Sequence, residues 1–180
     1  MPDRAVIHII DDEAGVRHSL RNLLESRGYK ARTYETAEDF VGQSISLAPG
    51  CIVLDLQMPG KTGLELQQHL VERGCPLPIV FLSGQANVHA AVTAMKGGAI
   101  EFLEKPISNH ELVAAVNRAT ELSFEAVERA FLVDTLTDRE RDVHRLIEQG
   151  MLNKQIASEL NISEKTVEFH KKNIRAKVTS

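Results

Sequence analysis

The feature that most constrains the fold of this chain is a fivefold alternation of short apolar runs with segments whose apolar residues recur at helical spacing. The apolar runs, such as IVFL, lack the polar alternation of a half-exposed strand, which is typical of strands buried on both faces. Strands that alternate with helices form a parallel sheet covered by helices on both sides. The pairs are AVIHII and VRHSLRNLLESRG, KARTYE and AEDFVGQ, CIVLD and GLELQQHLVERG, PIVFLSG and VHAAVTAMKGG, and EFLEKP and HELVAAVNRA.

Local signals mark where several of these helices begin and end. Ser108 and Glu111 have the spacing of a capping box, which predicts the start of the fifth helix. No helix-breaking residue follows in TELSFEAVERAFL, so we expect a helical linker at 123–136 after a first domain at 1–122. Glycines stand where helices are expected to end, at Gly28, Gly74 and the Gly97-Gly98 pair.

A different pattern begins at Thr137, which forms a second capping-box signal with Glu140. Three short helical segments follow, DRERDVHRLIEQ, NKQIASEL and EKTVEFHKKNIRAKV, with Ser163 as the expected N-cap of the third. Their spacing predicts a small all-α domain at 137–180. Eight apolar residues are expected to share its core: Val143, Leu146, Ile147, Ile156, Leu160, Ile162, Val167 and Ile174.

Charge is distributed unevenly between these two parts. Residues 1–136 carry 12 Lys and Arg against 18 Asp and Glu, whereas residues 137–180 carry 9 against 7. The basic residues concentrate in the last helical segment, which indicates a surface for an anionic partner. No apolar run is long enough to cross a membrane and no signal peptide is evident, so we expect a cytoplasmic protein without membrane contact.

Polar groups follow the expected strands at the points where the apolar runs end. They are Asp11 and Asp12 after the first strand, Asp55 after the third, Ser83 after the fourth and Lys105 after the fifth. Because parallel strands present their carboxyl ends at one edge of the sheet, all five should meet there. Three carboxylates in one crevice repel one another unless a cation joins them, and hard oxygen ligands with room for water suit Mg²⁺. Lys105 and Ser83 could then receive a phosphoryl group attached to Asp55.

Taken together, the motifs IIDDE, VLDLQMPG, FLSG and FLEKP make residues 1 to about 122 resemble the receiver domain of a bacterial two-component response regulator. The resemblance implies a flavodoxin-like (βα)5 doubly wound sheet with strand order 2-1-3-4-5. It also implies that Asp55 accepts a phosphoryl group from a sensor histidine kinase. Mg²⁺ would be held by Asp12, Asp55 and the backbone carbonyl of Gln57, with Asp11 assisting through water.

Further roles follow from the same resemblance. Ser83 and Lys105 would contact the phosphoryl oxygens. Phe102 would be the switch aromatic, whose packing changes when Ser83 moves. The bond between Lys105 and Pro106 is expected to be cis. Phosphorylation would make two receivers pair through their fourth and fifth helices. The resemblance also implies that the protein is a phosphoacceptor and not an enzyme.

The string from LTDRER to NKQIASELNISEKTVEFHKKNI resembles the LuxR-type helix-turn-helix of FixJ and NarL response regulators. That resemblance implies that the helix beginning near Glu164 enters the major groove of double-stranded DNA. Contacts to phosphates are expected from Lys165, Thr166, Lys171 and Arg175. Contacts to base edges are expected from Glu168, Phe169 and Lys172. His170 is expected to pack or to contact the DNA backbone.

Two alternatives to a transcription factor stay open. A receiver can act as a phosphate sink or protein-interaction switch, and an aspartate-nucleophile phosphatase also forms an aspartyl phosphate. The phosphatases usually need a second Asp two residues after the nucleophile, where this chain has Gln57. The LuxR-type domain also has a fourth helix after the recognition helix, whereas this sequence continues only to KVTS. We therefore expect the last helix to be missing and DNA binding to be weak.

Overall fold

The computed structural model describes residues 5–42, 48–84, 88–134 and 136–178. The chain divides into two compact units, residues 1–127 and 128–180, which are described separately below. Among the described residues, no helix combines the length and the hydrophobicity that crossing a bilayer requires.

The first unit is built on a parallel sheet of five strands, β1 to β5. Neighbouring strands pair in the order β2-β1-β3-β4-β5, which confirms the predicted fold class and strand order. Strands β3 and β4 are buried along their whole length, as their uninterrupted apolar runs predict. The strands are Val6–Ile10, Lys30–Tyr34, Gly50–Asp55, Ile79–Ser83 and Glu101–Glu104.

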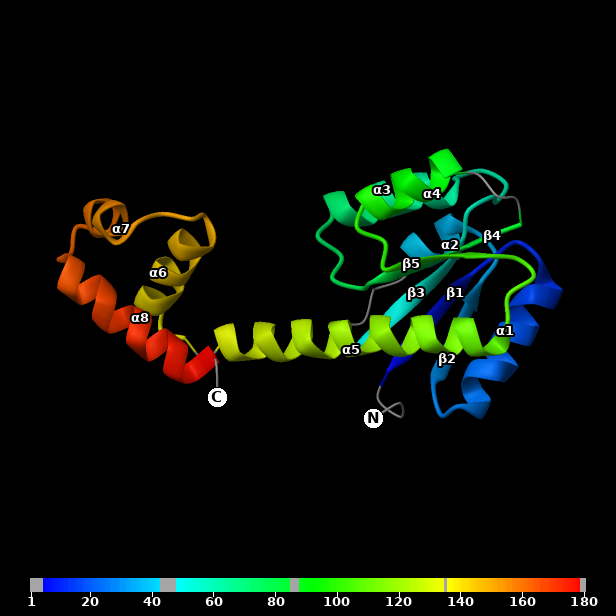
Figure 1. Ribbon diagram of the computed structural model, residues 1–180, viewed down its shortest axis with the longest axis horizontal. Helices are drawn as coiled ribbons and strands as arrows, with labels where there is room; N and C mark the ends of the chain where they lie inside the picture. The colour runs from blue at the N-terminus through cyan, green and yellow to red at the C-terminus, as the bar shows by residue number, and fades with distance from the viewer. Residues whose placement is uncertain (1–4, 43–47, 85–87, 135, 179–180) are drawn as a thin grey trace. The chain divides into compact units, whose positions relative to one another are not determined.

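Helices cover both faces of this sheet and bury a separate core on each (Figure 1). On one face, α1 (Ala14–Ser26) and α5 (Asn109–Asp134) pack over a core that includes Leu24 and Leu112. The other face carries three helices, and its core includes Phe40, Leu66 and Ala94. These helices are α2 (Ala37–Val41), α3 (Gly63–Glu72) and α4 (Val88–Lys96). A doubly wound sheet of this kind directs the carboxyl ends of its strands to one edge.

The predicted helix ends are present in the structure. Ser108 accepts a hydrogen bond from the backbone N–H of Glu111 and donates to its carboxylate, as the capping-box spacing predicts. Three of the predicted glycines have the positive φ of a C-terminal cap, at Gly28, Gly74 and Gly98.

Helix α5 runs without interruption from Asn109 to Asp134, so the helical continuation expected after the first domain is present. The buried hydroxyl of Ser123 accepts a hydrogen bond from the backbone N–H of Gly50 at 3.1 Å, which fixes the middle of α5 to the start of β3. Tyr29 adds a hydrogen bond to Asn117. The domain boundaries at 122 and 137 stay predictions.

The second unit contains α6 (Asp138–Glu148), α7 (Asn153–Glu159) and α8 (Glu164–Val178). Thr137 and Glu140 form the predicted capping box, and Ser163 accepts a hydrogen bond from the N–H of Thr166 at the start of α8. All eight predicted core residues belong to this core: Val143, Leu146, Ile156, Val167 and Ile174 are buried, and Ile147, Leu160 and Ile162 pack against them. Helices α7 and α8 therefore form a helix-turn-helix with its own small core.

Candidate functional site

The predicted polar residues do meet at one edge of the sheet. Asp11 follows directly after β1, Asp55 is the last residue of β3, and Ser83 is the last residue of β4. Lys105 follows directly after β5, and its backbone N–H donates to the carbonyl of Ser83 at 2.7 Å. The parallel register therefore brings side chains that are up to 94 positions apart in the sequence into one place.

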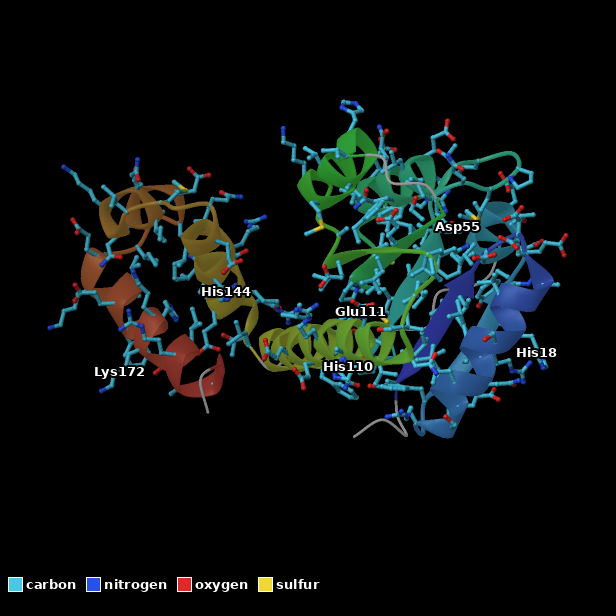
Figure 2. All side chains as sticks on the ribbon, turned by 45° about the vertical axis from the view of Figure 1, so that its right-hand side comes forward. His18, Asp55, His110, Glu111, His144 and Lys172 are labelled. Carbon is cyan, nitrogen blue, oxygen red and sulfur yellow. The ribbon has the colours of Figure 1, made fainter. Side chains whose placement is uncertain are left out.

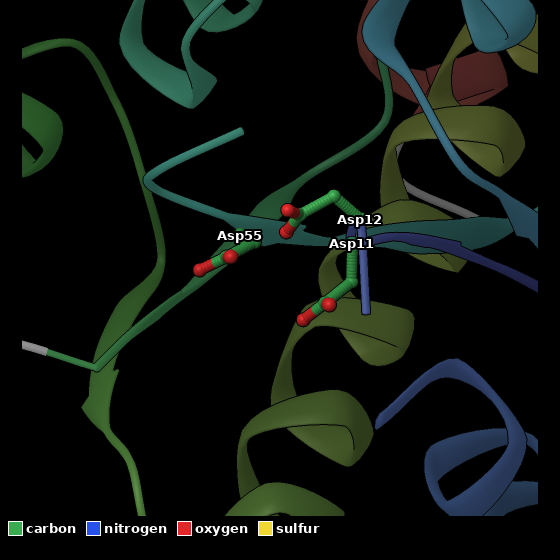
Figure 3. Close-up of side chains that lie close together, drawn as sticks. All are labelled: Asp11, Asp12 and Asp55. Atoms are coloured by element: carbon green, nitrogen blue, oxygen red, sulfur yellow. The ribbon is translucent and has the colours of Figure 1, made fainter. Parts of the chain in front are cut away.

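Three carboxylates form the centre of the site (Figure 3). One ligand oxygen from each of Asp11, Asp12 and Asp55 can be chosen so that all lie within 4.8 Å of one another. Asp11 and Asp55 are buried, at 0% and 5% exposed, while Asp12 is more accessible to solvent. Burial in this setting makes the repulsion between the carboxylates strong and favours a cation among them.

Lys105 supplies part of the compensating charge. Its ammonium group donates a hydrogen bond to Asp11 Oδ2 at 2.8 Å and lies 3.5 Å from Asp55 Oδ2. Only 17% of the Lys105 side chain is exposed, so little water screens these contacts. Lys105 is thus fixed between the two buried carboxylates.

The pKa values of both partners reflect this arrangement. Burial raises the pKa of Asp55; Lys105 opposes that shift, and the negative charge of Asp11 adds to it. Burial works against the charged form of Lys105, but its hydrogen bond and attraction to Asp11 and its attraction to Asp55 outweigh burial and raise the pKa of Lys105. The site therefore holds a firmly protonated ammonium beside a destabilised carboxylate.

The remaining predicted residues lie around this centre. Ser83 is buried at 1% exposure, and Phe102 is partly buried with its ring stacked on Phe81 at a centroid distance of 6.3 Å. Gln57 is exposed two residues after Asp55. The peptide bond between Lys105 and Pro106 is cis, as expected. The roles of Ser83, Phe102 and Gln57 in the chemistry stay predictions.

The donor set fits a hard divalent cation. Carboxylate oxygens from Asp11, Asp12 and Asp55 are the ligand type that Mg²⁺ prefers, and an open, partly exposed side at Asp12 leaves room for water. Sulfur and imidazole ligands, which suit zinc, are absent from this cluster as far as the structure describes it. A site of this composition can hold Mg²⁺ and accept a phosphoryl group at Asp55.

Sequence reasoning missed Arg17, a residue of α1 that reaches the same turn. Its guanidinium donates to the backbone carbonyls of Asp11 and Asp12 at 2.7 and 2.8 Å. The Arg at this position has no signature in the sequence, because its acceptors are backbone oxygens that any residue would offer.

In the second unit, α8 presents a basic and aromatic face to solvent. Lys165, Glu168, Phe169, Lys172 and Arg175 are exposed, and Phe169 is 60% exposed despite its size. The side chain of Lys172 can be followed on α8 in Figure 2. Exposed residues at spacings of three and four lie on one side of a helix, so this face can enter a groove of DNA.

Two of the predicted phosphate contacts are held by intramolecular hydrogen bonds. Lys171 donates to the side-chain oxygen of Asn153 at 3.0 Å, which ties α8 to the start of α7. Thr166 pairs its hydroxyl with that of Ser163 at 2.8 Å. His170 buries its Nδ1 without a hydrogen-bond partner in the described part of the chain, and its ring packs edge-on against Phe169. The DNA roles of these residues stay predictions.

Comparison with protein families gives two matches, one to the sheet-containing part of the chain and one to the helical part. Residues 7–117 match the response regulator receiver domain, and residues 134–179 match the bacterial regulatory proteins of the luxR family. The transcriptional regulatory protein TdiR of Thauera aromatica is 41% identical, covering 97% of this chain and 80% of TdiR. The transcriptional regulatory protein FixJ of Azorhizobium caulinodans is 38% identical, covering 99% of this chain and 88% of FixJ.

Two solved structures of response regulators match almost the whole length of this chain. The response regulator StyR matches with a TM-score of 0.66 and 38% identity, covering 98% of this chain and 92% of StyR. Full-length FixJ from B. japonicum matches with a TM-score of 0.62 and 35% identity, covering 98% of this chain and 91% of that structure. With the receiver fold, the acidic cluster and the helix-turn-helix, these matches show that the chain belongs to the two-component response regulators, joining a receiver domain to a LuxR-type DNA-binding domain that regulates transcription.

Proposed function

We propose that a sensor histidine kinase phosphorylates Asp55 in a Mg²⁺-dependent reaction and that this modification controls receiver pairing and DNA binding. The observation that carries the proposal is the position of Lys105, whose ammonium lies between Asp11 and Asp55 at the edge where the three carboxylates gather. A fixed positive charge beside a carboxylate nucleophile is the arrangement that phosphoryl transfer needs, because its transition state spreads negative charge over the transferred oxygens.

The chemistry assigns a role to each side chain. An oxygen of Asp55 attacks the phosphorus of a phosphohistidine; the new O–P bond forms as the P–N bond breaks, and the released imidazole takes up a proton from water. Lys105 attracts the phosphoryl oxygens, and the Ser83 hydroxyl donates to one of them. Asp12, Asp55 and the Gln57 carbonyl would hold Mg²⁺, with Asp11 assisting through water, and the bound ion would supply positive charge beside the phosphoryl group.

The protein is accordingly a phosphoacceptor and not an enzyme that turns over external substrates. A phosphatase of the aspartate-nucleophile class would require an acid or base two residues after Asp55, and Gln57 offers an amide that cannot protonate a leaving group at neutral pH. A lack of turnover of phosphomonoesters by the wild-type chain would support this assignment.

The proposed output has two parts. Helix α4 exposes three apolar side chains at helical spacing, Val88, Val92 and Met95, at 79%, 46% and 45% exposure, which supports pairing of receivers through α4 and α5. Helix α8 of the second unit then supplies base contacts from its exposed face. Pairing two receivers brings two such helices to one DNA site, as dimeric helix-turn-helix proteins require.

The test replaces Asp55 with Asn, which keeps the size of the side chain but removes its nucleophilic oxygen. Radiolabelled acetyl phosphate with Mg²⁺ should label the wild-type chain and leave the D55N variant unlabelled. Equal labelling of both proteins would remove the assignment of Asp55. Labelling that changes neither the association state nor DNA binding would instead indicate a receiver that acts as a phosphate sink.

A further inference from the structure

We propose that Arg17 is a positioning residue for the Mg²⁺ site. Its guanidinium holds the turn from which Asp11 and Asp12 project, so that both carboxylates face Asp55 at a separation that a cation can span. This inference rests on the proposed function, because it concerns the metal site used in phosphorylation of Asp55.

The hydrogen bonds of Arg17 go to the backbone of that turn, and its Nη2 lies 3.5 Å from the exposed carboxylate of Glu35. One nitrogen, Nη1, donates to the carbonyl oxygens of both Asp11 and Asp12, at 2.7 and 2.8 Å. These carbonyls lie beyond Ile10, the last residue of β1 to pair with the neighbouring strands. The Arg17 side chain is only 15% exposed, so two charge-assisted hydrogen bonds form where water competes weakly.

The other contacts of the turn act on the opposite side from Arg17. Asp11 uses Oδ1 to accept from the N–H of Glu13 at 2.9 Å and Oδ2 to accept from Lys105. The N-cap residue of α1, Glu13, makes no side-chain capping bond, so the helix start does not fix the turn by that route. The peptide after Asp12 is thus held from both ends: its N–H donates to Asp11 Oδ1, and its carbonyl accepts from the Arg17 guanidinium, the one side chain that also bonds the carbonyl of Asp11 in the described part of the chain.

Orientation of these peptides determines where the carboxylates lie. The three ligand oxygens come within 4.8 Å of one another, and a displacement of the backbone at Asp11 and Asp12 would carry both side chains away from Asp55. Groups that orient metal ligands without touching the metal typically contribute 10-fold to 100-fold in affinity. Arginine suits this position because its planar guanidinium is held at two nitrogens: Nη1 bonds the two carbonyls and Nη2 lies 3.5 Å from the exposed carboxylate of Glu35, whereas lysine offers a flexible point charge.

The primary test measures Mg²⁺ binding by titration calorimetry on the whole chain without any phosphodonor. Replacing Arg17 with Met should weaken Mg²⁺ binding at least about tenfold. The matched control is Arg21→Met, one turn further along α1, where the arginine pairs with Glu25 at 2.9 Å with both side chains well exposed. The R21M variant should bind Mg²⁺ as the wild-type chain does.

A second readout separates positioning from chemistry. If Arg17 acts only by placing the metal ligands, the R17M variant should need more Mg²⁺ for half-maximal phosphorylation by acetyl phosphate but reach the wild-type rate at saturating Mg²⁺. The R17K variant keeps the charge but lacks the rigid guanidinium and its second nitrogen facing Glu35, so its Mg²⁺ affinity should fall between those of R17M and the wild-type chain. A purely structural role would lower the melting temperature without this split.

Mg²⁺ affinity in folded R17M that matches R21M would overturn the inference. If circular dichroism shows that R17M is unfolded, R17K decides by the same comparison, and wild-type affinity there overturns it equally. The proposed function fails in a different way, through a wild-type chain that neither binds Mg²⁺ nor becomes labelled at Asp55. The two failures are therefore distinguishable.

Discussion

His8 is a buried titratable residue in β1, three positions before the acidic pair. It is 3% exposed, its Nδ1 lies 3.0 Å from the hydroxyl of Tyr34, and its ring contacts those of Tyr34 and Phe40. Burial, with a smaller effect of the positive charge of Arg32, lowers the pKa of His8 from 6.5 to about 4. The folded first unit therefore contains a neutral imidazole across the physiological range of pH.

This residue gives a pH dependence of stability. Because the folded pKa lies below the unfolded one, the unfolded state binds the proton first as pH falls, and the unfolding free energy decreases between pH 6.5 and about 4. The loss should approach about 2 to 3 kcal/mol at the lower limit. Urea unfolding at a series of pH values should show a shallower decrease for His8→Phe, while replacement of the exposed His18 by Gln should leave the slope unchanged. Parallel slopes for wild type and H8F would contradict the assignment.

For single residues, the sequence predicts the positions of those site residues that directly follow a strand. Asp11, Asp55 and Lys105 follow apolar runs, and the parallel sheet brings them together. Arg17 and the ion pair between Glu140 and Lys177, at 2.6 Å, could not be predicted. They depend on the direction in which a long side chain leaves its helix, and the spacing of residues along the chain does not encode that direction.

At the scale of elements, the turn between β3 and α3 is packed tightly beneath the site. Gly63, the first residue of α3, donates its N–H to the carbonyl of Leu56 at 3.0 Å. A Cβ atom at Gly63 would lie 2.4 Å from the backbone oxygen of Asp55 and 3.0 Å from the ring of Phe81. The turn that follows Asp55 therefore requires a residue without a side chain.

Replacing Gly63 with Ala should move this turn and destabilise the first unit by about 2 to 3 kcal/mol, because backbone atoms cannot yield as a flexible side chain does. Phosphorylation of Asp55 by acetyl phosphate should also slow, since the acceptor shares the displaced peptide. The matched control is Gly15→Ala in α1, where a Cβ would meet nothing within 4 Å. That change should leave stability equal or raise it by up to about 1 kcal/mol. Chemical denaturation of both variants tests the pair, and equal effects would contradict the close approach.

Most elements of the first unit follow from sequence patterns, since each strand run and each helix period predicts its own structure. The capping box of Thr62 and Glu65 at the start of α3 has the same spacing as the two that were predicted and was overlooked. The need for glycine at position 63 was not predictable, because it arises from a backbone atom eight residues earlier, brought near only by the fold.

At the scale of the whole molecule, the two units have separate cores and opposite charge. The described core of the second unit includes Val143, Val167 and Ile174, and the basic residues of α8 give residues 137–180 an excess of positive charge. Residues 1–136 carry the negative excess, which disfavours contact with a polyanion such as DNA. DNA affinity should therefore depend on α8 and on salt.

DNA binding through the basic residues of α8 should weaken steeply as the salt concentration rises. Contacts with about 6 to 10 phosphates should reduce the affinity of the phosphorylated chain for its DNA site by roughly 10³-fold to 10⁵-fold between 50 and 200 mM salt. Replacing the exposed Arg175 with Met removes one expected phosphate contact, so the slope of log affinity against log salt should become shallower by about 1. The control is Glu159→Gln on α7, which also changes the net charge by one unit but removes no phosphate contact on α8, so it should leave the slope unchanged. An affinity that does not change with salt, measured by fluorescence anisotropy, would count against DNA binding by this face.

The position of Lys105 among the carboxylates also sets an electrical balance. With Asp11, Asp12 and Asp55 ionised and Lys105 protonated, the four side chains leave two negative charges, which one Mg²⁺ neutralises. Phosphorylation replaces the single charge of Asp55 with a group carrying about −1.5 to −2, so the neutral site becomes negative. If Mg²⁺ and the phosphoryl group bind as proposed, reciprocity requires that the modified receiver hold Mg²⁺ more tightly than the unmodified one and that Mg²⁺ favour the phosphorylated state by the same factor. The concentration of Mg²⁺ would thus affect how much of the receiver is phosphorylated, in addition to the kinase.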